Sequence, residues 1–201
     1  MPWISLLVAM TLSVDAHPPA PVDCSVDRDA MLALSIDAFD QDINGGWRPL
    51  GEGRGCHLAA AELIAEYRRV HRPDGHNLLD WHEAQLRAKG GQTAEAIALM
   101  RRSTRGEEGD RSGWNAYVAG SIAFLEGDRA GLHAAREALS AVPPPPGLQA
   151  RPGFVTVQGP EGTPIEIPWP PNLDVLEAFE RCFGDSYRHA YESPQCRRQT
   201  P

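Results

Sequence analysis

The chain has 201 residues, 42% of them hydrophobic, and a formal net charge of −8 at pH 7. This hydrophobic content supports a genuine core and excludes a protein that is disordered over most of its length. The acidic excess gives no electrostatic footprint for nucleic acid or for anionic lipid, so we expect no nucleic-acid partner.

The first sixteen residues have the pattern of an export signal. Residues 2–14 carry no charged side chain and include a short apolar core, although no Lys or Arg precedes that core. Val14 and Ala16 then place small residues at the −3 and −1 positions of a cleavage site before His17. The apolar core is shorter than the roughly 20 residues of a membrane span, so no span is predicted. We expect residues 1–16 to be removed and the remainder to be exported, to the periplasm or outside the cell.

All four cysteines lie beyond this expected signal: Cys24, Cys56, Cys182 and Cys196. An even number of cysteines in an exported chain indicates two disulfides, and four cysteines permit three pairings. Of these we favour Cys24 with Cys56 and Cys182 with Cys196, because each pair then closes a short loop. The cysteines do not form a close Cys-x-x-Cys pair, so a metal site built from them is the less favoured interpretation.

Apolar residues recurring at helical spacing predict a mainly α fold. The expected helices cover residues 27–39, 56–71, 77–88, 94–103, 113–126, 129–142 and 173–193. Glycines separate several of them, and polar residues that suit N-caps precede them. These caps are Thr93, Ser112, Asp128 and Asn172. Residues 40–55 are rich in glycine and are predicted to form a loop, which Trp47 and Leu50 attach to the core.

Four consecutive prolines, Pro143–Pro146, begin a segment of different character. Two β-prone runs, Phe154–Val157 and Ile165–Ile167, flank a Gly-Pro-Glu-Gly sequence, which predicts a small β-hairpin. The chain therefore divides into four parts. They are the signal (1–16), a helical-repeat domain (17–142), a proline-rich segment with the hairpin (143–171), and a C-terminal helix and tail packed on the same domain (172–201).

Two adjacent units share one layout, in which a helix is followed by a glycine and then by a capped helix rich in alanine. Their inter-helix glycines, Gly91 and Gly127, are 36 residues apart (127 − 91), close to the tetratricopeptide period of about 34. Residues 78–141 therefore resemble a pair of tetratricopeptide-like helical hairpins. The resemblance covers about a third of the chain. It implies stacked antiparallel hairpins with a groove for an extended or helical peptide, or with a docking face for a partner protein.

The aromatic residues Trp81, Trp114 and Tyr117 lie on these repeat helices. They are candidates for peptide binding in such a groove. The interpretation that we favour is that they fill the core between helices, because large aromatic residues at helical spacing usually pack inward.

Two patterns share features with metal sites. Residues 40–45 (DQDING) resemble the start of a calcium loop, but the twelfth position holds Gly51 instead of a bidentate Glu. His82-Glu83 begins a zinc-binding helix pattern that lacks its second histidine. A turn-rich loop with solvated carboxylates explains the first pattern better, and the neighbouring His71 and His76 flank a Pro-Asp-Gly turn and are expected at the surface. We therefore predict no metal site and no cofactor.

The sequence holds no nucleophile elbow, phosphate loop or dinucleotide fingerprint, so we predict no catalytic residue. Glu62 and Glu66 lie four residues apart and could serve acid–base chemistry, but such pairs are more often a solvated face that the nearby Arg68 and Arg69 would neutralise. These observations favour an exported module that binds a protein or peptide. The alternatives are a periplasmic or secreted hydrolase with a site in the helical concavity and a structural component of the cell envelope.

Overall fold

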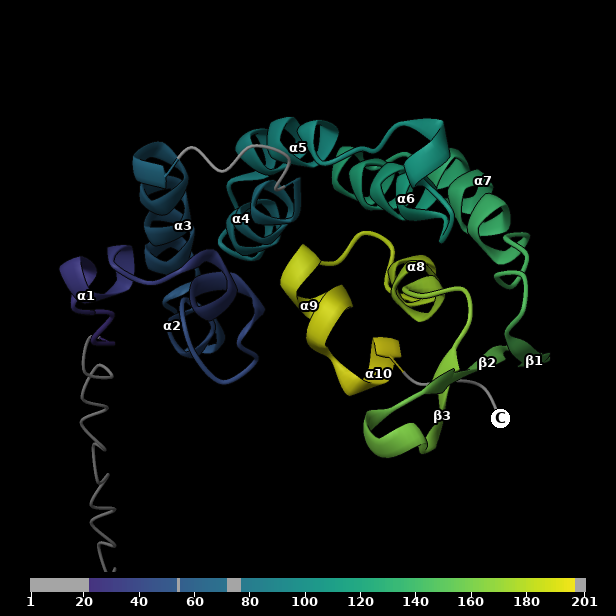
Figure 1. Ribbon diagram of the computed structural model, residues 1–201. Coiled ribbons are helices and arrows are strands. Elements are labelled where there is room, and N and C mark those ends of the chain that lie inside the picture. The colour runs from purple at the N-terminus through teal and green to yellow at the C-terminus, as the bar shows by residue number, and fades with distance from the viewer. Residues whose placement is uncertain (1–21, 54, 72–76, 198–201) are drawn as a thin grey trace, which may run out of the picture.

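The computed structural model describes residues 22–53, 55–71 and 77–197, and the expected signal lies outside them. The fold is mainly α, with stacked antiparallel helical hairpins and a small antiparallel sheet, as the sequence predicts (Figure 1). The helices are α1 (Arg28–Leu32), α2 (Arg48–Glu52), α3 (His57–His71), α4 (Asn77–Lys89), α5 (Thr93–Arg102), α6 (Trp114–Glu126), α7 (Arg129–Ser140), α8 (Leu173–Arg181), α9 (Tyr187–Glu192) and α10 (Pro194–Arg197). The strands are β1 (Gln149–Arg151), β2 (Phe154–Gln158) and β3 (Pro164–Pro168), and the short helical turns are η1 (Asp37–Gln41), η2 (Glu107–Gly109) and η3 (Pro160–Gly162).

Glycine turns create the two central hairpins, α4–α5 and α6–α7. Gly91 and Gly127 have φ angles of +84° and +71°, in the left-handed region that L side chains rarely adopt. Asp128 then caps α7, where its carboxylate accepts a hydrogen bond of 2.9 Å from the Gly131 N–H. The partner helices therefore reverse direction tightly, and they pack against one another along their length.

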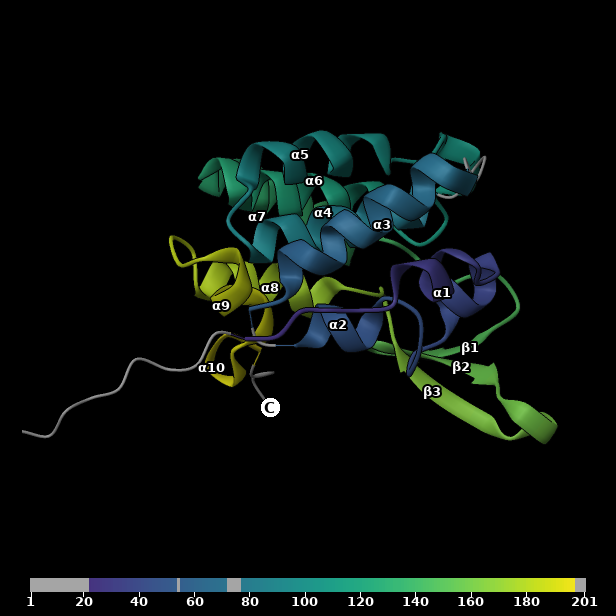
Figure 2. The same cartoon turned by 90° about the vertical axis from the view of Figure 1, so that its left-hand side faces the viewer.

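Helix α3 and the two hairpins follow one another in an arc, and the C-terminal helices lie inside its curve (Figure 1). Helix α8 packs against α6 and α7, and α9 packs against α4. Figure 2, turned by 90°, shows α8 and α9 below α4 and α7. The concave side of the helical arc is therefore filled by the chain's own C-terminal helices.

Two apolar clusters form the core. The larger one joins α4–α7 to α8 and α9, and its centre includes the stacked rings of Phe124 and Phe179, whose centroids are 4.5 Å apart. The smaller one joins the N-terminal segment to α3 and α4 and includes the stacked rings of Phe39 and Tyr67, 3.8 Å apart. Each fully buried side chain of this size contributes about 1.5–3 kcal/mol. The C-terminal helices therefore contribute to the main core of the protein.

Two disulfides fasten the ends of this arrangement. Cys24–Cys56 ties the N-terminal segment to the start of α3, and Cys182–Cys196 ties the end of α8 to α10. Both pairs are the ones predicted from the sequence, where each was favoured because it closes a short loop.

The expected helix over residues 27–39 is wrong, because the structure breaks it. Helix α1 ends at Leu32, and the π-helical turn η1 begins only at Asp37. Ser35 lies in the break, and its hydroxyl accepts a hydrogen bond of 3.3 Å from the Ala38 N–H, which competes with a continuous helix. The expected loop over residues 40–55 is also wrong in part, because it contains α2; Trp47 is buried there, as predicted.

The expected final helix is likewise divided. Helix α8 ends at Arg181, Gly184 adopts a φ of +97°, and Ser186 caps the separate helix α9. The predicted hairpin gains a third strand, since β1 pairs with β2, and β2 pairs with β3, both antiparallel. Two caps are shifted by one residue: Gln92 precedes α5 and Gly113 precedes α6.

Candidate functional site

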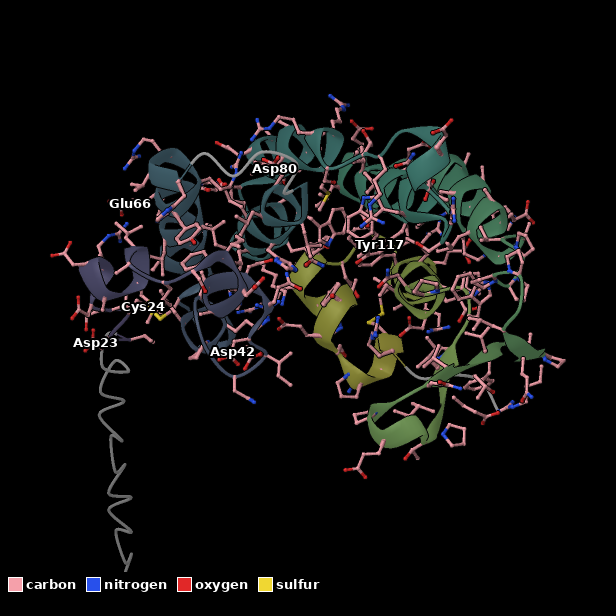
Figure 3. The ribbon with its side chains drawn as sticks, in the orientation of Figure 1. Asp23, Cys24, Asp42, Glu66, Asp80 and Tyr117 are labelled. Carbon is pink, nitrogen blue, oxygen red and sulfur yellow. A yellow bond between two sulfur atoms is a disulfide. The ribbon has the colours of Figure 1, made fainter. Side chains whose placement is uncertain are left out.

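The three aromatic residues proposed from the sequence, on α4 and α6, pack against one another in the larger apolar cluster. Trp81 and Tyr117 are buried, Trp114 is partly buried, and the Trp81 ring centroid lies 5.0 Å from that of Trp114 and 4.8 Å from that of Tyr117. Figure 3 shows Tyr117 at the boundary between the arc and α8. Burial raises the pKa of Tyr117 well above its ordinary value. The rings pack inward in this structure, as the interpretation favoured from the sequence expects.

A cleft of about 480 Å³ opens elsewhere, between the sheet and helices α7 and α8. We call it the Trp169 cleft. One side presents aromatic and apolar side chains, and the other presents carboxylates and guanidinium groups. The apolar lining is Gly153, Phe154, Pro168, Trp169, Pro170 and Leu173. The charged lining is Arg136, Asp174, Glu177, Glu180 and Arg181.

A second hollow of about 400 Å³ adjoins the Trp169 cleft. The two share Gly153, Phe154, Trp169 and Pro170, so they form one groove along the sheet. Pro144, from the four-proline segment, lies on the wall of the second hollow. Volumes of a few hundred Å³ are typical of sites that hold small ligands or short peptide segments.

Trp169 joins the sheet to the end of α7. Its indole N–H donates to the Val142 carbonyl at 3.1 Å, and its backbone N–H donates to the Gly153 carbonyl at 2.9 Å. Phe154 pairs with Pro168 in the β2–β3 register, which puts both residues on one face of the sheet. Trp169 is therefore held by backbone carbonyls from the turn before β2 and from the segment after α7.

Beside the cleft, Arg151 of β1 braces the same sheet face. Its guanidinium lies 3.9 Å from the centroid of the Phe154 ring and forms two hydrogen bonds, of 2.7 and 2.8 Å, with the carboxylate of Glu166. The hydrogen bond from Arg151 lowers the pKa of Glu166. Arg151 therefore links the Phe154 ring of β2 to Glu166 of β3.

Ion pairs organise the charged wall. Asp174 pairs with Arg197 at 2.5 Å, and Glu180 pairs with Arg136 at 3.4 Å. Glu177 has the loosest partner, since its carboxylate lies 3.9 Å from the guanidinium of Arg181. Three carboxylates and two guanidinium groups line the cleft, so its lining has an acidic excess.

The carboxylate of Asp40 is buried, which corrects the expectation of a solvated calcium-like loop. Its Oδ1 accepts from the indole N–H of Trp47 at 2.9 Å and lies 2.7 Å from Nδ1 of His82, and its Oδ2 accepts from the amide of Gln41 at 2.6 Å. Burial raises the pKa of Asp40, but the His82, Trp47 and Gln41 contacts outweigh it and lower the pKa overall. Protein groups thus occupy both oxygens of this carboxylate, and the Asp40–His82 pair ties η1 to α4.

The paired carboxylates of α3 have separate partners. Glu62 pairs with Arg87 at 3.0 Å, and Glu66 pairs with Arg28 and, at 3.6 Å, with Arg69. Neutralisation by Arg69 therefore agrees with the sequence prediction. Neutralisation by Arg68 does not, because Arg68 turns to α4, where it pairs with Asp80 and with the buried Glu83.

Comparison with family models, with curated protein sequences and with solved structures gives no match to this chain. The helical hairpins are compatible with the tetratricopeptide-like resemblance, and membership of that family stays a prediction. Among the described residues, no helix has the length and apolar character to span a membrane.

Sequence reasoning missed the Trp169 cleft. Its walls come from α8, from β2 and β3 with residues that flank these strands, and from one residue of α7, and only the fold brings these elements together. One local signal was available: Trp169 lies in a Pro-Trp-Pro-Pro sequence, where prolines fix an aromatic side chain next to apolar neighbours.

Proposed function

We propose that this protein is an exported interaction module that holds an extended, proline-containing peptide with a basic side chain in the Trp169 cleft. The observation that carries this proposal is the pairing of an aromatic and proline wall with an acidic wall across one groove.

The aromatic wall suits an extended peptide. Proline-rich segments adopt the polyproline II conformation before binding, so they lose little conformational entropy when they dock against aromatic side chains. Phe154 and Trp169 belong to both hollows, so a bound segment would contact the same rings along its course.

The acidic wall supplies the specificity for charge. Carboxylates outnumber guanidinium groups on the lining, so a Lys or Arg side chain of the peptide is favoured over an acidic one. Glu177 is the preferred contact, because its 3.9 Å separation from Arg181 leaves it able to form a shorter hydrogen bond with a ligand.

The signal pattern of residues 1–16 and the two disulfides support an exported location, since disulfides persist in oxidising compartments. A peptide in the helical concavity, or a hydrolase site there, would require α8 and α9 to leave the positions that they occupy against α4, α6 and α7. The Trp169 cleft needs no such movement.

The test is isothermal titration calorimetry with two peptides that differ at one position. A proline-rich peptide with a central Arg should bind, and the same peptide with Glu in place of Arg should bind at least about tenfold more weakly, a difference of about 1.4 kcal/mol. Glu177→Lys should weaken the Arg peptide by a similar factor. Glu95→Lys makes the same charge change at an exposed residue of α5 outside the lining, and it should leave binding unchanged.

Two outcomes would contradict the proposal. One is the absence of saturable binding by any proline-rich Arg peptide. The other is equal weakening by Glu177→Lys and Glu95→Lys, which would show that the total charge of the protein, rather than the cleft, governs the interaction.

A further inference from the structure

Four side chains with metal-binding atoms converge where α8, α9 and α10 meet. They are Cys182, Asp185, His189 and Cys196, and their ligand atoms all lie within 4.8 Å of one another. Cys182 follows α8, Asp185 lies in the following turn, His189 is on α9 and Cys196 is on α10. This is the single group of its kind found among the described residues.

We propose that these four residues form a zinc site when the Cys182–Cys196 disulfide is reduced. In the oxidised protein the two sulfurs are bonded to each other and carry no thiolate charge, so the site exists only in the reduced state. The disulfide and the zinc ion are alternative crosslinks between α8 and α10.

The geometry suits a tetrahedral ion. Zinc binds thiolate sulfur at about 2.3 Å and imidazole nitrogen at about 2.0–2.1 Å, so tetrahedral ligand atoms lie roughly 3.3–3.8 Å from one another. Nε2 of His189 and Oδ2 of Asp185 are already 3.7 Å apart. Breaking the disulfide allows the two sulfurs to separate to the required spacing, and the remaining distances between ligand atoms need to close by no more than about 1.0–1.5 Å.

The surroundings also suit a metal that enters from solvent. Asp185 and His189 are exposed and Cys182 is partly buried, whereas Cys196 is fully buried. Two backbone hydrogen bonds hold this region in place without the disulfide: the Cys196 N–H donates to Ser193 at 3.0 Å, and the Asp185 N–H donates to Cys182 at 3.1 Å. The guanidinium of Arg181 donates to the Cys196 carbonyl at 2.7 Å, which further fixes α10 against the end of α8.

The chemistry has two balanced steps. A dithiol reductant supplies two electrons and two protons, so the Cys182–Cys196 bond breaks to give two thiols while the reductant forms its own disulfide. Zinc then binds both sulfurs as thiolates and releases two protons, with neutral His189 and ionised Asp185 as the other ligands. Soft thiolates together with imidazole favour zinc over calcium or magnesium.

The cysteine spacing alone does not indicate this site, because it contains no close Cys-x-x-Cys pair. The ligands instead follow the spacing Cys-x2-Asp-x3-His-x6-Cys, and the turn at Gly184 and the short helix α9 are what bring them to one point.

The experiment uses two full-length variants that each retain two cysteines. Cys24→Ser/Cys56→Ser keeps the proposed site, and Cys182→Ser/Cys196→Ser keeps the other pair. Both are reduced with a phosphine, the free thiols are counted, and Zn²⁺ is titrated anaerobically against a chromogenic chelator. The Cys24→Ser/Cys56→Ser variant should bind one Zn²⁺ per chain when reduced and at least a hundredfold more weakly when oxidised. With Co²⁺ it should show the intense bands of tetrahedral, thiolate-bound cobalt.

Single substitutions test the other two ligands. In the Cys24→Ser/Cys56→Ser background, His189→Ala should weaken zinc binding at least tenfold, whereas His133→Ala, at an exposed histidine of α7, should not change it. Either of two results overturns the proposal. One is that the reduced Cys24→Ser/Cys56→Ser variant, with two confirmed free thiols, fails to bind Zn²⁺, whether or not circular dichroism shows it to be folded. The other is that the Cys182→Ser/Cys196→Ser variant binds Zn²⁺ equally well.

Discussion

Phe179 offers the sharpest test of how strongly the C-terminal helices are joined to the arc. Its side chain is fully buried, stacks on Phe124 of α6 at 4.5 Å and lies 5.2 Å from the ring of Tyr187 on α9. Truncation of a buried Phe to Ala typically costs 3–5 kcal/mol through lost burial and the cavity left behind, and this stacked position should cost about 4 kcal/mol.

Phe183 provides a matched control two residues after α8. It is partly buried, its ring meets Phe124 edge-on at 6.0 Å, and the guanidinium of Arg129 lies 4.2 Å from its centroid. Since Phe183 is only partly buried and meets the core at its edge, Phe183→Ala should cost less, about 1–2 kcal/mol.

Urea unfolding followed by circular dichroism, with the disulfides intact, measures both costs. For a domain whose total stability is about 5–15 kcal/mol, both variants should still fold, with Phe179→Ala having the lower midpoint and an unchanged m value. A cost for Phe179→Ala no greater than that for Phe183→Ala would refute the reasoning, because it would mean that α8 contributes little to the core.

Three further substitutions test local interactions. Asp40→Asn should destabilise the protein by about 2–3 kcal/mol at pH 6, because the buried donors around that carboxylate lose their ionised acceptor. The pKa of Asp40 in the folded protein lies below its ordinary value of 3.8, so the ionised carboxylate stabilises the fold above pH 3.8, and this stabilisation is lost as the pH falls through the folded pKa. Urea unfolding at pH 3 should therefore show a smaller difference between wild type and variant. Gly113→Ala should cost about 2–3 kcal/mol by thermal unfolding, because φ is +76° and the added Cβ would lie 2.6 Å from a Leu139 methyl group. In the control Gly127→Ala the added Cβ meets no atom within 4 Å, so the positive φ alone should cost about 1 kcal/mol. Glu83→Ala should cost about 3 kcal/mol in urea unfolding, because it removes the buried partner of two arginines, while the exposed Glu62→Ala should cost under about 0.5 kcal/mol.

Local signals in the sequence predict most of the helical architecture. Gly127 followed by Asp128 specifies a tight turn and a capped helix, and the structure contains both. The break after Leu32 was not predictable from periodicity, because apolar residues continue at helical spacing through Phe39 while Ser35 caps a new turn. The same holds for the C-terminal region, where the apolar face continues from α8 into α9 across Gly184.

The location of the candidate site could not be predicted in the same way. The sequence indicated that Trp81 and Tyr117 lie on repeat helices, but whether a groove stays open depends on where a segment about 60 residues later packs. That packing is set by long-range contacts such as Phe124 with Phe179, which no local pattern encodes. The Trp169 cleft follows from the same packing, because α8 forms its charged wall.

Hydrogen–deuterium exchange of the free, oxidised protein tests the central claim most directly. If α8 fills the concave side of the arc, the amides of residues 177–181 should exchange as slowly as those of α6, within about tenfold, because both helices open only with the larger core. Exchange in α8 that is orders of magnitude faster than in α6, with α4–α7 still protected, would contradict the account and would show that the concave face is open in solution.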